Sequence, residues 1–162
     1  MTSKSYLNLL TVLHASLIMG QLLFLVLIYF LINAGKEPLP GVAASAQTEV
    51  YIIGSIMIMC VLASSQIFGM RVRHLQTRSE LSEKLNGYRT IFIVRLALLE
   101  APSLLAMVFY MISNNLLLLL FSGMIILLQL ILRPTKYRIK QDLALSPAEQ
   151  ALLDNPDAAL FS

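Results

Sequence analysis

Long apolar stretches dominate the pattern along this chain, and short polar segments separate them. The stretches cover residues 6–32, 50–70, 90–112 and 116–132. A helix that crosses the hydrocarbon core of a bilayer, roughly 30 Å thick, needs about 17–25 residues, and each stretch reaches that length. The pattern therefore predicts an all-α integral membrane protein, a bundle of four spanning helices, rather than a soluble helical bundle.

The predicted organisation is a single four-span transmembrane domain over residues 1–140, followed by a cytoplasmic tail over 141–162. In the tail, Ser146-Pro147-Ala148-Glu149 combines an N-cap serine, a proline at the first helical position and a glutamate at the third. This motif predicts a short helix over 147–154. The link Ser113-Asn114-Asn115 is so short that the last two spans must form an antiparallel hairpin.

The connections carry turn and capping signals. The first connection contains a turn-rich segment at residues 35–41. In the mixed-charge middle segment, residues 71–89, Thr77 and Glu80 fit a capping box, and Asn86-Gly87 predicts a helix break. We expect helical extensions or a short surface helix there, with a solvated connector as the alternative. After Arg133-Pro134 the fourth span should stop or kink.

Composition supports the membrane assignment. Of the 162 residues, 57% are hydrophobic and only 13% are charged, whereas about 25% are charged in a typical soluble domain. The first stretch is too long for the apolar region of a cleaved signal peptide. The single cysteine, Cys60, excludes an intrachain disulfide and is expected to be a packing residue.

Basic residues gather on one side of the predicted spans. Ten lie before the first stretch, in the middle segment, or after the fourth stretch: Lys4, Arg71, Arg73, Arg78, Lys84, Arg89, Arg133, Lys136, Arg138 and Lys140. Only Lys36 lies in the connections on the other side. The positive-inside rule then places both termini and the middle segment in the cytoplasm. Anionic lipid headgroups are the expected partners of these charges, and no nucleic-acid motif accompanies them.

Glu100 is the main candidate for a functional residue, because it lies near the middle of the third span. A charged group in hydrocarbon is costly unless it is paired, hydrated or protonated. Arg95 lies five residues away, about 140° around the helix, so the two do not face each other directly. Pro102 predicts a kink that frees the carbonyl group of Leu98.

Further polar residues lie inside the other spans: His14, Gln21, Gln66 and Gln129. In one interpretation they form, with Glu100 and Arg95, a buried hydrogen-bonded network that fixes how the helices pair. In a second, Glu100 exchanges a proton or binds a cation, with His14 as relay. Binding of a lipid headgroup or a small ligand is a third. Ala97 and Ala101 would let a neighbouring helix pack close beside Glu100.

No enzymatic chemistry is indicated. The sequence lacks HExxH, GxSxG and Walker motifs and has two histidines, His14 and His74. We therefore expect no enzymatic activity, no metal and no cofactor. The predicted role is a small structural or accessory component, as a homo-oligomer or in a larger membrane complex. The alternative is a proton- or cation-coupled component that uses Glu100 as ion carrier.

Two resemblances centre on this third span. Tyr88-Arg89, the run Arg95-Leu96-Ala97-Leu98-Leu99-Glu100-Ala101-Pro102, and Arg133-Pro134-Thr135 resemble a family of uncharacterised bacterial four-span inner-membrane proteins, over residues 88–156. This resemblance implies the topology and a bacterial inner (plasma) membrane location, but no activity. The segment 97–101 is also similar to the carboxylate helix of the c subunits of rotary ATP synthases, which implies an ion-carrying Glu100. The sequence departs from that family in its longer connecting loop and in lacking a glycine-rich second span.

Overall fold

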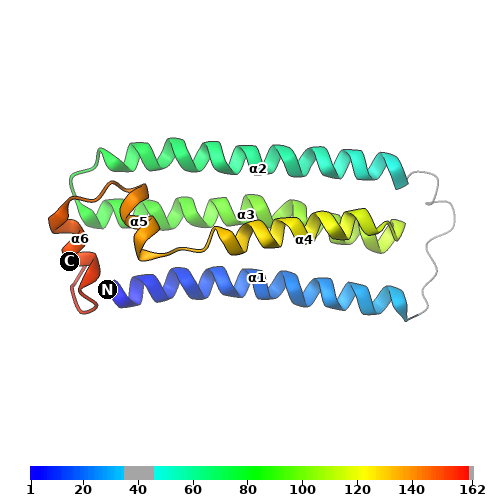
Figure 1. The fold of residues 1–162 in the computed structure, drawn as a ribbon, viewed down its shortest axis with the longest axis horizontal. Helices are drawn as coiled ribbons and strands as arrows, with labels where there is room; N and C mark the ends of the chain where they lie inside the picture. The colour runs from blue at the N-terminus through cyan, green and yellow to red at the C-terminus, as the bar shows by residue number, and fades with distance from the viewer. Residues whose placement is uncertain (35–45, 161–162) are drawn as a thin grey trace. The chain divides into compact units, whose positions relative to one another are not determined.

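The computed structural model describes residues 1–34 and 46–160, and these residues form six helices. In chain order the helices are α1 (Ser3–Asn33), α2 (Ala46–Gln76), α3 (Leu81–Ser113), α4 (Leu116–Ile131), α5 (Lys136–Asp142) and α6 (Pro147–Asp154) (Figure 1). The described ranges contain no strand, only an isolated bridge between Thr2 and Ala159. The all-α prediction is confirmed. The turn-rich segment 35–41, with Lys36, lies outside the described residues.

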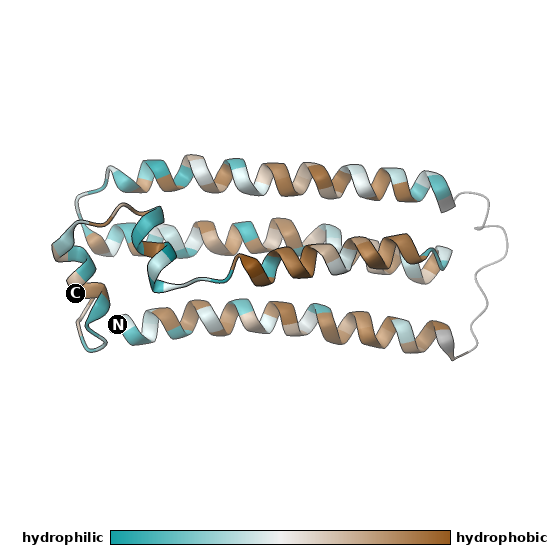
Figure 2. Ribbon diagram, in the orientation of Figure 1, coloured by the Kyte–Doolittle hydropathy of each residue, from teal (hydrophilic) through white to brown (hydrophobic). Residues whose placement is uncertain are grey.

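Three helices, α1, α2 and α3, are each long and apolar enough to cross a membrane. A fourth crossing is counted only if α4 and α5 are taken together, and they are bent by 84° relative to each other. In the most apolar window of α1 and of α2 only 17% of the residues are buried, so most of these apolar side chains face outward. Figure 2 shows apolar residues along these helices and more polar ones in α5 and α6. The protein is therefore a helical membrane protein with three to four candidate spans.

The predicted stop after the fourth apolar stretch is confirmed. Helix α4 ends at Ile131, and α5 begins after Thr135, whose side chain accepts a hydrogen bond from the backbone N–H of Arg138. Pro134 lies in the turn, where its missing N–H and fixed φ angle prevent the helix from continuing.

The predictions for the middle segment need two corrections. Helix α2 continues to Gln76 and α3 begins at Leu81, so the helical extensions are present, but α3 has no break at Asn86-Gly87. The helix continues because Leu85 and Tyr88 are buried on either side of this pair. A Cβ on Gly87 would overlap the Leu75 side chain, so the glycine serves a close approach of α2 to α3.

The second correction concerns the capping box. The Thr77 hydroxyl does not cap α3 but donates a hydrogen bond to the His74 carbonyl, 2.8 Å away, at the end of α2. Since the connection spans only residues 77–80, Thr77 lies closer to the end of one helix than to the start of the next.

The chain forms two compact units. Unit 1 contains residues 1–15, 65–96 and 133–162, and unit 2 contains residues 16–64 and 97–132. Eleven of the twelve basic residues belong to unit 1, and Lys36 is the exception. The tail at 141–162 belongs to the same unit as parts of α1, α2 and α3.

In unit 1 the tail docks onto the first turns of α1 and α3 (Figure 1). The Ser3 hydroxyl donates to the Leu153 carbonyl at 2.6 Å, and the Lys84 ammonium lies 2.7 Å from the Glu149 carboxylate. The predicted helix over 147–154 is confirmed as α6, with Ser146 as N-cap, and the structure adds a capping box between Ser146 and Glu149. The two ends of the described chain also pair, because the N–H of Leu160 donates to the carbonyl of Met1.

In unit 2 the helices α3 and α4 form the predicted hairpin. Asn114 adopts a left-handed conformation, with φ of 52°, and Asn115 is the N-cap of α4. The Ser122 hydroxyl donates to the Ser103 carbonyl at 2.8 Å, which joins the two antiparallel helices. The apolar core of this unit contains residues of α1, α2, α3 and α4, among them Ile28, Ile53, Met107 and Ile126.

Candidate intramembrane polar site

Two of the predicted polar residues meet in unit 2. The Gln21 side-chain amide of α1 donates a hydrogen bond to the Gln129 amide oxygen of α4, at 2.9 Å. The two residues are 0% and 1% exposed, so this bond is shielded from solvent and lipid. The Oε1 of Gln21 and the Nε2 of Gln129 have no hydrogen-bond partner among the described residues. The hydrogen bond therefore links α1 to α4 through one polar atom of each side chain and leaves the other polar atom of each without a partner among the described residues.

Pro102 lies inside α3, which continues past it to Ser113. The next residue, Ser103, provides the carbonyl that accepts the hydrogen bond from Ser122. Sequence reasoning missed both serines, although Ser122 is a visible polar position in the leucine-rich fourth stretch. Serine hydroxyls commonly bond between membrane helices in this way.

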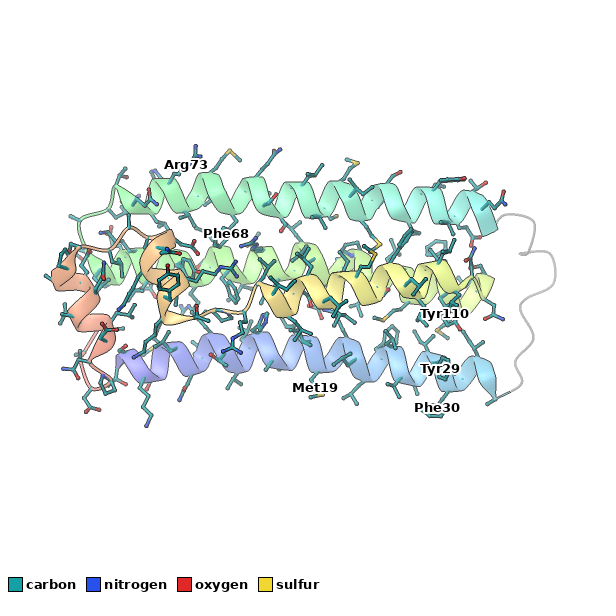
Figure 3. The ribbon with its side chains drawn as sticks, in the orientation of Figure 1. Met19, Tyr29, Phe30, Phe68, Arg73 and Tyr110 are labelled. Carbon is teal, nitrogen blue, oxygen red and sulfur yellow. The ribbon has the colours of Figure 1, made fainter. Side chains whose placement is uncertain are left out.

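Arg95 belongs to unit 1, and its partner is an aromatic ring. The guanidinium carbon of Arg95 lies 4.3 Å from the ring centroid of Phe68, which α2 directs towards α3 (Figure 3). A guanidinium over an aromatic face gains electrostatic stabilisation, and the gain increases when the site is dry. The Nε of Arg95 is buried without a hydrogen-bond partner among the described residues. Sequence spacing could not reveal this contact, because Phe68 and Arg95 lie on different helices.

His14 is also buried in unit 1, at 5% exposure. Its ring centroid lies 5.9 Å from that of Phe92. Neither ring nitrogen has a hydrogen-bond partner in the described part of the chain. Phe92 stacks in turn on Tyr88, so His14 extends an aromatic cluster.

Glu100, in unit 2, takes part in none of these contacts. It is half-buried. The ion pairs found in residues 1–34 and 46–160 are Arg78–Glu83, Lys84–Glu149 and Lys140–Asp154, and Glu100 joins none of them. It also makes no hydrogen bond within the described residues. Ala97 and Ala101, which flank it on α3, are both exposed. No residue of the described chain compensates the carboxyl group.

Gln66 is exposed on α2 and has no place in a buried network. The predicted polar residues are thus divided: Gln21 and Gln129 bond to each other, Arg95 and His14 contact aromatic rings, and Gln66 faces outward.

Sequence reasoning missed a cluster of paired polar side chains in unit 1. Lys84 is 7% exposed and paired with Glu149, and the Tyr88 hydroxyl donates to the Asp142 carboxylate at 2.9 Å. Burial of Glu149 opposes its ionisation, but hydrogen bonds from Lys84 and Ser146 outweigh this effect and lower its pKa below the usual value. These contacts attach α5 and α6 to α3. The capping motif at Ser146 was the available signal for the helix, but not for its docking partner.

No group of three or more histidine, cysteine, aspartate or glutamate residues gathers as a metal site in the described part of the chain. Comparison with known proteins finds no matching family model, no matching curated protein and no matching solved structure. The fold and the candidate site thus define the class, a helical protein with three to four candidate membrane spans. The resemblances drawn from the sequence stay predictions.

Proposed function

We propose that this chain is a non-enzymatic structural or accessory component of a membrane complex, and that the face of α3 around Glu100 packs against a helix of another chain. The observation that carries the proposal is that Glu100, near mid-span, is half-buried and has no partner among the described residues. Ionisable groups inside membranes almost always pair with a polar group or reach water. The proposed partner is therefore a polar group of another chain, since the residues described in 1–34 and 46–160 supply none.

The neighbouring positions on α3 support close packing. Ala97 and Ala101 are exposed, so the small-residue surface beside Glu100 is not covered by a side chain of its own unit. Small residues let helix backbones approach closely, which favours association in lipid. The polar groups that are paired within the chain, such as Gln21–Gln129 and Ser103–Ser122, link one helix to another and so serve packing.

The topology that accompanies this role has four crossings, with both termini in the cytoplasm. The docking of residues 1–3 onto residues 153–160 within unit 1 supports it. Since the two ends lie on the same side, the number of crossings must be even. With α1, α2 and α3 spanning the bilayer, we assign the fourth crossing to α4 and the residues that follow it, because the 16 residues of α4 alone extend only about 24 Å. The resemblance to bacterial four-span proteins supports an inner-membrane location for this proposed bundle.

Purification in a mild detergent, followed by mass measurement of the intact particle, tests the assembly. We expect the wild-type chain to retain an oligomer or a co-purified protein, and Glu100→Leu to lose it. Gln66→Leu is the matched control, because it makes a similar polar-to-apolar change at an exposed position and should leave assembly intact. A stable lone monomer for the wild-type chain contradicts the proposal.

A second candidate function is a proton- or cation-coupled component in which Glu100 carries the ion. A half-buried carboxyl group that has no counter-charge in the described part of the chain favours it, because such a group can bind an ion from outside the chain. Proteoliposomes separate the two functions. Ion carriage predicts a flux that Glu100→Gln abolishes while assembly persists, and the absence of any wild-type flux would remove this candidate.

A further inference from the structure

We propose that a groove between α2 and α3, at the basic end of both helices, binds one anionic phospholipid. The groove has a volume of about 420 Å³, and every residue that lines it belongs to unit 1. Arg71, His74 and Thr90 line its polar part, and Ile67, Ile91 and Val94 line its apolar part. The proposal is independent of Glu100, which belongs to unit 2.

The polar and apolar parts follow one another along the helices. Arg71 lies one turn after Ile67 on α2, and Thr90 lies one turn before Val94 on α3, a step of about 6 Å in each case. Towards Ile67 and Val94 both helices enter their long apolar stretches, and towards Arg71 and His74 they approach the polar connection at 77–80. A phospholipid whose phosphate group lies beside Arg71 would therefore direct its acyl chains towards the middle of the membrane.

Charge favours an anion at the polar end. Arg71 belongs to none of the ion pairs formed within residues 1–34 and 46–160. Three carboxylates of the tail have partners elsewhere, since Glu149 pairs with Lys84, Asp154 pairs with Lys140, and Asp142 accepts a hydrogen bond from Tyr88. The guanidinium of Arg71 therefore keeps its charge available for a phosphate, which it can bind through two parallel hydrogen bonds.

His74 adds a second donor. Its Nε2 lies 3.4 Å from an Nη of Arg78. Because an arginine nitrogen can only donate, Nε2 is the acceptor, and the neutral ring then carries its proton on Nδ1. That N–H is available to a phosphate oxygen. Basic pockets at the cytoplasmic ends of membrane helices are suited to anionic headgroups for this reason.

Gly87 and Leu75 also line the groove. Because Gly87 has no side chain, Leu75 can pack directly against α3 at this point, and a Cβ on Gly87 would overlap the Leu75 side chain. The apolar walls that remain argue for a lipid rather than a free phosphate ion, which would gain nothing from Ile67, Ile91 and Val94.

Native mass spectrometry of the full chain in a neutral detergent tests the proposal, with dioleoyl phosphatidylglycerol as probe and dioleoyl phosphatidylcholine for comparison. We expect one phosphatidylglycerol per chain, bound in preference to phosphatidylcholine. Arg71→Ala should weaken this binding about fivefold. Arg73→Ala is the matched control, because Arg73 leaves the same helix away from α3 (Figure 3) and should bind like the wild type.

A second variant keeps the charge and fills the apolar half. Val94→Trp should lose the bound lipid while Arg71 remains in place, so the result does not depend on the folding of Arg71→Ala. Equal binding of the two lipids, or equal weakening by Arg71→Ala and Arg73→Ala, overturns the proposal. Displacement of phosphatidylglycerol by millimolar inorganic phosphate would identify a free-anion site and also overturn it.

Discussion

The ion pair between Lys84 and Glu149 offers the sharpest test of how the tail is held. The Lys84 ammonium lies 2.7 Å from Oε1 of Glu149, and the two side chains are 9% and 15% exposed. The Glu149 carboxylate also accepts a hydrogen bond from the Ser146 N–H at 2.7 Å. Replacing Lys84 by methionine keeps the length of the side chain and removes its charge. The carboxylate then remains poorly solvated with only its Ser146 partner.

The expected loss can be estimated from these contacts. Removing one partner of a fully buried ion pair costs about 3–5 kcal/mol, and a hydrogen bond to a charged group contributes about 1.5–3 kcal/mol. Because water still reaches part of Glu149 and Ser146 retains its bond, the cost should fall below the buried limit. We expect Lys84→Met to lower the free energy of unfolding by about 2–3 kcal/mol.

Unfolding by a denaturing detergent in mixed micelles measures this loss, and a double-mutant cycle assigns it to the pair. Lys84→Met with Glu149→Leu removes both charges, so the double variant should be more stable than the sum of the single effects predicts, by at least about 1 kcal/mol. Lys136→Met is a control, since the exposed ammonium of Lys136 makes a long, 3.5 Å hydrogen bond to the Asp154 carbonyl and belongs to no ion pair among the described residues. Additive effects in the cycle, or a loss below about 0.5 kcal/mol for Lys84→Met, would refute the reasoning.

Three further outcomes are expected. Because the pKa of Glu149 is lowered in the folded protein, its ionised carboxylate contributes fully to stability above the ordinary glutamate pKa of about 4.3, and this contribution is lost as the pH falls through the pKa of the folded state. The rate of hydrogen exchange in α6, corrected for intrinsic rates, should therefore rise in acid, and it should rise less in Lys84→Met. Gln21→Leu should cost about 1 kcal/mol because it leaves Gln129 unpaired, whereas the double change with Gln129→Leu should be nearly neutral in the same unfolding assay. Epitope tags at the two termini should become accessible to protease on the same side of sealed vesicles, and protection of only one tag would contradict four crossings.

The helices themselves were predictable because their causes are local. Apolar stretches of sufficient length, the Arg133-Pro134 stop, the short link at 113–115 and the capping box at Ser146 act within a few residues along the chain. Where local signals competed with packing, the prediction failed. Asn86-Gly87 is a turn signal, but the burial of Leu85 and Tyr88 holds it in a continuous helix.

The pairing of polar side chains was decided by the tertiary structure alone. Whether Arg95 meets Glu100 or Phe68, and whether Gln129 meets Gln21 or faces lipid like Gln66, depends on the rotation and register of one helix against another. The rotation and register of a helix result from the packing of many side chains, so they cannot be derived from the spacing of residues within one helix. The sequence by itself determined a helical membrane protein with a carboxyl group in its third span. Only the fold left that carboxyl group without a partner among residues 1–34 and 46–160, because helix packing and not sequence distance sets which groups can touch.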